Sequence, residues 1–272
     1  MPTQTEKADR LLALHHGDQP LLMPNPWDRG SALLFASLGF SALATTSSGF
    51  AATLGRADGN VTRDEAIGHG QWIAAGTDLP VSADLENCFA DDPDGVAETV
   101  RLAVAAGLAG CSIEDYANRE QDPIYDHALA ADRVAAAAAA AHSGPVHLVL
   151  TARAENYLRG NPSLPDTIAR LQSYQQAGAD VLFAPGVTKP EEIRDLVAAV
   201  DRPVNVLALP GTPTVSELAA MGVKRISVGG AFAFTGLNAV AEAARELREK
   251  GTYGYWEQAG PGAHAARAAF AR

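Results

Sequence analysis

The chain has 272 residues, of which 21 are basic and 32 acidic, so its formal net charge is −11 at neutral pH. No basic stripe accompanies this acidity, which argues against nucleic acid as a partner. No run of about 18 apolar residues is present to span a membrane, and the N-terminal segment lacks the apolar core of a signal peptide, so we expect a cytoplasmic protein without a membrane contact.

Short apolar, β-branched runs alternate with helical patterns along the whole chain. The predicted strands are residues 21–24, 42–45, 81–84, 110–114, 146–152, 181–184, 204–207 and 225–228. The predicted helices are residues 29–38, 63–75, 95–106, 128–141, 165–177, 190–200, 215–221 and 231–250. This alternation predicts a parallel (β/α)₈ TIM barrel. No linker interrupts it, so we expect a single domain over residues 1–272, with a C-terminal tail from about residue 252.

Two acidic pairs follow two of the predicted strands. Asp84 and Glu86 stand at the end of the third strand, and Glu114 and Asp115 stand at the end of the fourth. Each acid alone could simply cap the helix that follows it. Carboxylates that converge at matching strand ends repel one another unless a cation compensates them. Oxygen-only ligands suit a hard ion such as Mg²⁺, so the two pairs together favour a divalent metal site.

Other strand ends carry groups that suit an anionic substrate. Arg153 has a rigid fork of donors that can hold a carboxylate or phosphonate, although an ion pair with Glu114 or Asp84 is the alternative. Residues 45–49 form a hydroxyl-rich segment, interpreted as a turn, whose N–H groups can bind an anion, although small polar turns are common. The expected substrate-binding residues are Thr46, Ser47, Ser48, Gly49, Asp84, Arg153 and Asn205.

Taken in chain order, these motifs resemble those of the isocitrate lyase/phosphoenolpyruvate mutase superfamily. They are Pro24-Asn25-Pro26-Trp27-Asp28, Ser47-Ser48-Gly49, Leu54-Gly55-Arg56-Ala57-Asp58, Asp84-Leu85-Glu86, Ile113-Glu114-Asp115 and Ala152-Arg153. The resemblance extends from about residue 24 to about residue 229. It implies a TIM barrel whose last helix is exchanged between neighbouring chains, in a homo-oligomer (a dimer or tetramer). Residues 265–270 are the expected exchanged helix.

The resemblance also implies a metal ion and a substrate class. Mg²⁺, or Mn²⁺ in its place, is expected to be held directly or through water by Asp58, Asp84, Glu86 and Glu114. The expected substrate is a small 2-oxo carboxylate or a phosphonate. The expected catalytic residues are Arg153, Glu114 and Asp58.

One departure from the superfamily pattern concerns catalysis. The lyase branch has a Lys-Lys-Cys-Gly-His loop after the Glu-Asp pair, whereas residues 116–123 contain neither lysine nor cysteine. Cys88 and Cys111 precede this loop and are expected to be buried, reduced thiols. Cleavage of isocitrate or methylisocitrate is therefore disfavoured. Tyr116, His127 and Glu155 are the candidates for acid-base chemistry, although a structural role is the favoured interpretation of each.

Three functions stay open at this stage. The first is a Mg²⁺-dependent lyase that cleaves a C–C bond of a 2-oxo acid through a metal-stabilised enolate, as an oxaloacetate decarboxylase would. The second is a mutase or hydrolase that acts on a P–C bond of a phosphonate. The third is a binding protein for 2-oxo acids that has lost the catalytic loop. The sequence does not identify the substrate.

Overall fold

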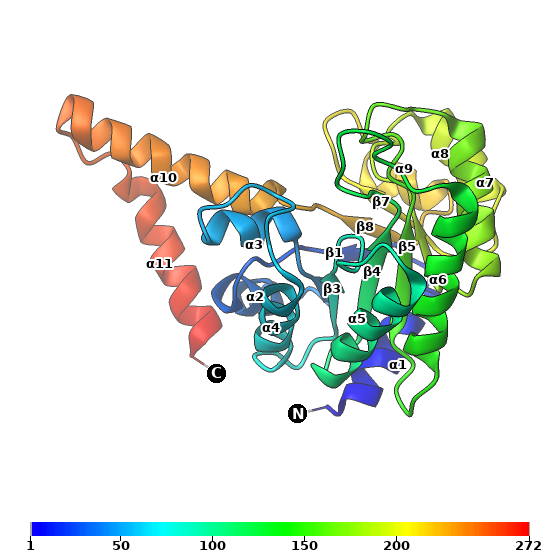
Figure 1. Cartoon of the computed structure of the whole chain (residues 1–272). Coiled ribbons are helices and arrows are strands. Elements are labelled where there is room, and N and C mark those ends of the chain that lie inside the picture. Colours follow the sequence, from blue (N-terminus) through cyan, green and yellow to red (C-terminus); the bar gives the residue numbers. More distant parts are fainter. Residues whose placement is uncertain (1, 272) are drawn as a thin grey trace.

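The computed structural model describes residues 2–271 and forms a barrel of eight parallel strands with helices around it (Figure 1). The strands are β1 (Leu21–Met23), β2 (Leu43–Ala44), β3 (Val81–Asp84), β4 (Gly110–Glu114), β5 (Val149–Arg153), β6 (Val181–Phe183), β7 (Val204–Leu207) and β8 (Arg225–Ser227). Hydrogen-bonded neighbours follow the order β1-β8-β7-β6-β5-β4-β3-β2. A bond of 3.1 Å from the Ala44 amide to the Pro24 carbonyl links β2 to the end of β1. The predicted (β/α)₈ barrel is confirmed.

The helices alternate with these strands, and some were not predicted. They are α1 (Gln4–Leu14), α2 (Arg29–Ser37), α3 (Ser47–Thr53), α4 (Arg63–Ala74), α5 (Pro93–Ala105), α6 (His127–His142), α7 (Leu164–Gln176), α8 (Pro190–Ala198), α9 (Val215–Ala220), α10 (Ala231–Lys250) and α11 (Trp256–Phe270). The predicted helices agree with α2 and α4–α10 to within two residues at each end. Among residues 2–271, none of the helices has the length and apolarity needed to cross a bilayer.

The expectation of a turn at residues 45–49 is wrong, because helix α3 begins there. Thr46 is the N-cap of α3, and its hydroxyl accepts the Gly49 amide at 3.3 Å. The run Thr-Ser-Ser-Gly is therefore a helix start signal rather than a turn signal. Gly49 is needed for space and not for an unusual backbone conformation, since a Cβ there would lie 2.6 Å from Thr46 Cγ2.

Helix α1, which the sequence did not predict, covers the N-terminal end of the barrel. Its buried Ala8 and Leu11 belong to the same apolar cluster as Val149 and Val181 at the starts of β5 and β6. The Lys7 ammonium group donates to the carbonyl oxygens of Ala74 and Thr77, at 3.2 and 2.6 Å. The apolar contacts and these two hydrogen bonds close this end of the barrel.

The predicted C-terminal tail contains a helix of its own. Helix α10 extends away from the barrel, and α11 returns to pack against α2 of the same chain (Figure 1). Large apolar side chains of α10 remain exposed, including Leu237 at 51% and Val240 at 67%. The exchange of a terminal helix between chains stays a prediction. Light scattering of the purified protein would show whether the oligomer that such an exchange requires is formed.

The neighbouring acids Glu114 and Asp115 serve opposite sides of the barrel wall. Glu114 belongs to the cluster at the strand ends, whereas Asp115 is directed toward the helices. One Asp115 carboxylate oxygen accepts the Tyr174 hydroxyl at 2.6 Å and Arg170 at 3.1 Å, and the other accepts the Glu155 amide at 2.8 Å. Asp115 therefore ties α7 to the ends of β4 and β5.

Replacing Tyr174 by phenylalanine should lower the free energy of unfolding by about 1.5–3 kcal/mol, the usual contribution of a hydrogen bond to a charged group. The ring is fully buried and would keep its packing, so only the bond to Asp115 is lost. Urea unfolding followed by circular dichroism measures the change. Tyr253→Phe is the matched control, because Tyr253 is 64% exposed and its loss should change stability by less than about 0.5 kcal/mol. Equal effects of the two substitutions would contradict the anchoring role of Asp115.

Candidate active site

A polar cavity of about 170 Å³ lies at the C-terminal ends of the strands. Its polar lining consists of Asn25, Thr45, Thr46, Ser47, Ser48, Asp58, Ser82, Asp84, Ser112, Arg153, Arg225 and Ser227. Most of the predicted substrate-binding residues are therefore on the cavity wall. Gly49 lies one step further along α3, where it packs against Thr46.

Asn205 is the predicted substrate-binding residue that the structure places elsewhere. Its side chain is buried, and its amide nitrogen donates to the Ser227 hydroxyl at 3.0 Å. Ser227 lines the cavity, but Asn205 does not. Asn205 therefore orients the Ser227 hydroxyl and does not itself line the cavity.

Arg153 binds three carboxylates at once. Its guanidinium group contacts Asp84 at 3.0 Å, Glu114 at 3.1 Å and Glu155 at 2.8 Å. Its Nε also donates to Glu155, at 2.9 Å. The structure therefore contains the ion pairs that were the alternative to a substrate contact for Arg153. The arginine lies at the cavity wall and holds the acidic cluster together.

Asp84 is the acid most firmly fixed in the cavity. One of its carboxylate oxygens accepts the Ser47 amide at 3.0 Å, and the other accepts Arg153. Its own amide donates to the Thr45 hydroxyl at 2.8 Å. Glu86 follows in a left-handed backbone conformation with a φ of 50°, which is unusual for a residue with a side chain. The turn after β3 therefore holds both acids at the cavity entrance.

The cluster contains more carboxyl groups than Arg153 can pair with, and some of them keep a proton. Burial, followed by the negative charges of Asp84 and Asp58, raises the pKa of Glu86 to about 8. Burial also raises the pKa of Glu114 well above its usual range, although Arg153 opposes this shift. A bound cation would lower the free energy of such a cluster.

The predicted metal ligands meet at this end of the barrel but do not form one tight shell. Asp58 and Asp84 line the cavity, whereas Glu86 and Glu114 line an adjoining hollow beside the loop that follows β4. Within residues 2–271, no three of these four acids place ligand atoms within 4.8 Å of one another. Their oxygen donors and excess charge fit a hard ion such as Mg²⁺ that keeps several of its waters.

Two arginines of the site were missed by the sequence analysis. The guanidinium group of Arg159 stacks on the Tyr116 ring at 3.4 Å and lies 3.6 Å from Glu155. Arg225 is buried at the start of β8 and reaches the cavity, where burial and then the charge of Arg153 lower its pKa to about 10. A charged residue inside an apolar strand pattern was the available signal for Arg225.

The three acid-base candidates have different surroundings. His127 bonds to the Ser173 hydroxyl at 2.9 Å, a contact between α6 and α7 outside the barrel, which agrees with the structural role favoured for it. Glu155 is fully buried and paired with Arg153. Tyr116 lies beside the site, with its hydroxyl donating to Asn118 at 3.2 Å. The two cysteines are buried free thiols, as predicted.

The protein is a (β/α)₈ barrel with an acidic, arginine-containing pocket at the C-terminal ends of its strands. The chain belongs to the phosphoenolpyruvate phosphomutase family, whose model matches residues 11–248, and thus to the isocitrate lyase/phosphoenolpyruvate mutase superfamily. This superfamily contains lyases and mutases that act on substrates of the 2-oxo acid type.

Individual relatives agree with this assignment. A Burkholderia cenocepacia protein described as a candidate lyase/mutase is 49% identical, with a TM-score of 0.94 over 97% of this chain and 95% of that chain. An uncharacterized Mycobacterium tuberculosis protein is 35% identical over 87% of this chain and 88% of its own length. An oxaloacetate acetylhydrolase in complex with the product oxalate is 26% identical, with a TM-score of 0.84 over 93% of this chain and 90% of that chain.

Replacing Arg153 by methionine should destabilise the fold by about 3–5 kcal/mol, because it leaves buried carboxylates without their counter-charge. The free energy of unfolding in urea measures this loss. Arg101→Met is the matched control, since Arg101 is 61% exposed and its pair with Glu98 should contribute about 1 kcal/mol or less. A similar stability for both variants would show that Arg153 does not hold the acidic cluster together.

Replacing Glu86 by glutamine should remove a pH-dependent loss of stability in metal-free protein. The folded chain keeps the Glu86 proton up to a pKa of about 8, whereas the unfolded chain releases it near the ordinary value of 4.5. The contribution of Glu86 is therefore complete below the lower value and is lost as pH rises through the upper one. The urea midpoint of Glu86→Gln should gain on that of the wild type between about pH 5 and pH 8. Parallel pH profiles would rule out the shifted carboxyl group.

Proposed function

We propose that this protein is a Mg²⁺-dependent lyase that cleaves a C–C bond in a small 2-oxo dicarboxylate, as in the decarboxylation of oxaloacetate. The observation that carries the proposal is the small polar cavity in which Asp84 and Arg153 stand side by side. Its volume of about 170 Å³ is below the roughly 300 Å³ typical of sites for drug-sized ligands. The similarity to an oxaloacetate acetylhydrolase that holds oxalate supports the same substrate class.

The acids at the cavity entrance would hold the metal ion. Asp84 is the proposed direct ligand, because it is central and firmly positioned. Asp58, Glu86 and Glu114 would act mainly through water. When bound, the ion would act as a Lewis acid that stabilises negative charge on the 2-oxo oxygen of the substrate.

Positive and dipolar groups of the chain would bind the substrate carboxylates. The hydroxyls of Thr46, Ser47 and Ser48 line the cavity at the beginning of α3, where helix N–H groups favour an anion. Arg225 places a buried positive charge on the cavity wall, and its Nε has no hydrogen-bond partner within residues 2–271. Arg153 bridges Asp84 and Glu114 and fixes their orientation, so we assign it a positioning role as well as a contact with substrate.

The loop after β4 would shield the reaction from water. Its Asn118 donates to the Gly59 carbonyl at 3.2 Å, which joins it to the loop that carries Asp58. The isolated bridge between Tyr116 and Ile124 gives this loop a defined shape. Exclusion of water lowers the local dielectric constant and strengthens each electrostatic contact with the substrate.

Decarboxylation is the cleavage that this site supports best. Removal of CO₂ needs an electron sink and a later proton, whereas a retro-aldol cleavage also needs a base for a hydroxyl proton. His127 lies outside the site and Glu155 is engaged by Arg153, so neither is available as that base. A homo-oligomer (a dimer or tetramer) that exchanges the C-terminal helix and a cytoplasmic location belong to the same proposal.

Asp84→Asn should lower kcat/KM for oxaloacetate by about 100-fold or more, because it removes the proposed metal ligand and disturbs Arg153. Pyruvate formation is measured with Mg²⁺ and with EDTA, against an enzyme-free sample that gives the spontaneous rate. Asp64→Asn is the control, since this acid is 87% exposed and its ion-pair partner is Arg63, which is not part of the acidic cluster. Activity that survives EDTA or Asp84→Asn would refute the proposal.

Two results would select the alternatives. Mg²⁺-dependent binding of oxaloacetate by calorimetry without any turnover would identify a binding protein for 2-oxo acids. Conversion of phosphonopyruvate, followed by ³¹P NMR in the absence of oxaloacetate turnover, would identify a P–C bond mutase or hydrolase.

A further inference from the structure

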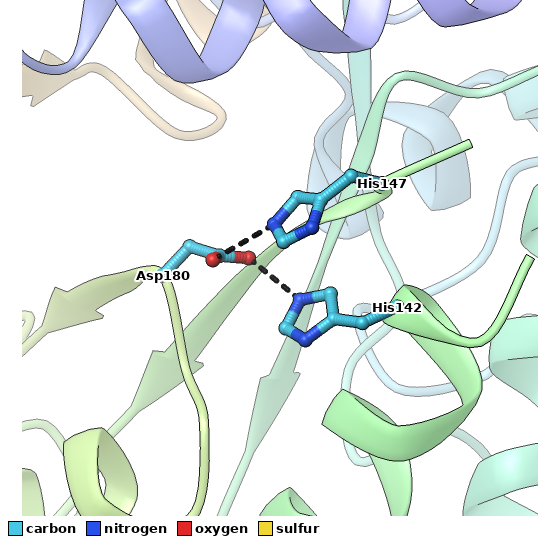
Figure 2. A group of neighbouring side chains, drawn as sticks. All are labelled: His142, His147 and Asp180. Atoms are coloured by element: carbon cyan, nitrogen blue, oxygen red, sulfur yellow. Dashed lines mark hydrogen bonds and ion pairs between the residues drawn. The ribbon is translucent and has the colours of Figure 1, made fainter. Parts of the chain in front are cut away.

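A second group of potential metal ligands lies at the opposite end of the barrel from the cavity. His142 is the last residue of α6, His147 stands in the loop before β5, and Asp180 directly precedes β6 (Figure 2). The two histidines belong to the connection between α6 and β5, Asp180 comes from the connection before β6, and their ligand atoms all lie within 4.8 Å of one another. Within residues 2–271, no other three histidine, cysteine or acidic side chains meet this condition.

The two imidazoles approach the same carboxylate. His142 Nε2 lies 3.0 Å from one oxygen of Asp180, and His147 Nε2 lies 3.0 Å from the other (Figure 2). The rings are stacked, with centroids 4.0 Å apart and planes inclined by 7°. Two ligand atoms of a tetrahedral Zn²⁺ ion stand roughly 3.3–3.6 Å apart when the bonds are about 2.0–2.2 Å long. The Asp180 oxygens are slightly closer than this to the two imidazole nitrogens. One imidazole must turn out of the parallel stack so that both nitrogen lone pairs point at the same ion.

The carboxylate is held in place before any ligand arrives. The Leu150 amide donates to Asp180 at 2.8 Å, and the Asp180 amide donates to the Leu150 carbonyl at 2.9 Å. These two bonds fix Asp180 against β5. A pre-positioned ligand loses little conformational entropy on binding, which favours a metal site.

The charge on Asp180 has no permanent counter-charge beside it. Its side chain is only 9% exposed, and its ion-pair partners within the described residues are the two imidazoles, with no lysine or arginine within 4.0 Å. Each Nε2–H donates a hydrogen bond to the carboxylate, but a neutral imidazole brings no net positive charge. A divalent cation would supply the charge that this buried acid lacks.

We propose that His142, His147 and Asp180 bind a Zn²⁺ ion at the N-terminal end of the barrel. Two imidazole nitrogens and one carboxylate suit zinc, whereas Mg²⁺ and Ca²⁺ prefer oxygen ligands alone. His147 is 39% exposed and His142 is 26% exposed, so the ion can enter from solvent, and water can complete its coordination. The ion joins the end of α6 to the starts of β5 and β6 and stabilises the folded chain.

The test titrates metal-free protein with ZnCl₂ by calorimetry, in a buffer with excess Mg²⁺ so that the carboxylates at the other end of the barrel are occupied. We expect one zinc ion per chain, a higher melting temperature with zinc, and shifted ¹⁵N resonances of both imidazoles. His147→Gln keeps a side-chain donor for Asp180 but removes the nitrogen ligand. It should weaken zinc binding by about 100-fold or more while it preserves the melting temperature without zinc.

His264→Ala is the control, because this exposed histidine of α11 is remote in the chain from the group. It should leave zinc affinity unchanged. The absence of zinc binding in the wild type, or an unchanged affinity in His147→Gln, would overturn the proposal and leave the three residues as a hydrogen-bonded group only. Asp84→Asn should bind zinc as the wild type does, which separates this site from the proposed catalytic centre.

Discussion

Arg153 carries the charge on which the arrangement of the candidate site depends. The loop after α3 and the ends of β3, β4 and β5 place carboxylates at the same end of the barrel. The mutual repulsion of these carboxylates would otherwise separate the strand ends that hold them. The arginine contacts Asp84, Glu114 and Glu155, so it joins the ends of β3, β4 and β5. Burial, together with the charges of Asp84 and Asp58, nevertheless raises the pKa of Glu86 well above its ordinary value. The strand ends are thus held together by one arginine within a cluster that contains more acids than it can pair with.

The barrel could be predicted from the chain because its signals are local and repeated. Apolar runs of strand length, amphipathic helices and glycines at helix ends recur often enough that an error in one element does not change the count. The misses have local causes. The strand predicted from residue 146 begins at Val149, since Val146 packs beneath α1 in a loop. Helix α3 was taken for a turn, because a short polar helix has no apolar periodicity and begins with the same residues as many turns.

The candidate site could be located from the sequence, but its contacts could not. Residues at the C-terminal ends of parallel strands converge by topology, which placed Asp84, Glu114 and Arg153 together. Which donor faces which acceptor depends on side-chain rotation and burial, and no sequence pattern encodes these. For the same reason Asn205 was assigned to the substrate although it turns to Ser227. His142 was interpreted as a solvated or helix-capping residue, because the sequence alone does not bring Asp180, 33 residues beyond His147, to the two histidines of the α6–β5 connection.

The adjacent acids Glu114 and Asp115 have a consequence for how β4 can pair with its neighbours. Side chains alternate across a strand, so a shift of one residue would exchange the two faces of β4. Glu114 would then leave Arg153, and Asp115 would leave Arg170 and Tyr174, with buried charges on both sides of the wall. Apolar strands resist such a shift only through packing. Glu114 and Asp115, at the end of β4, each have a cation on their own side of the barrel wall. Electrostatics therefore favours the one pairing register in which Glu114 faces the site.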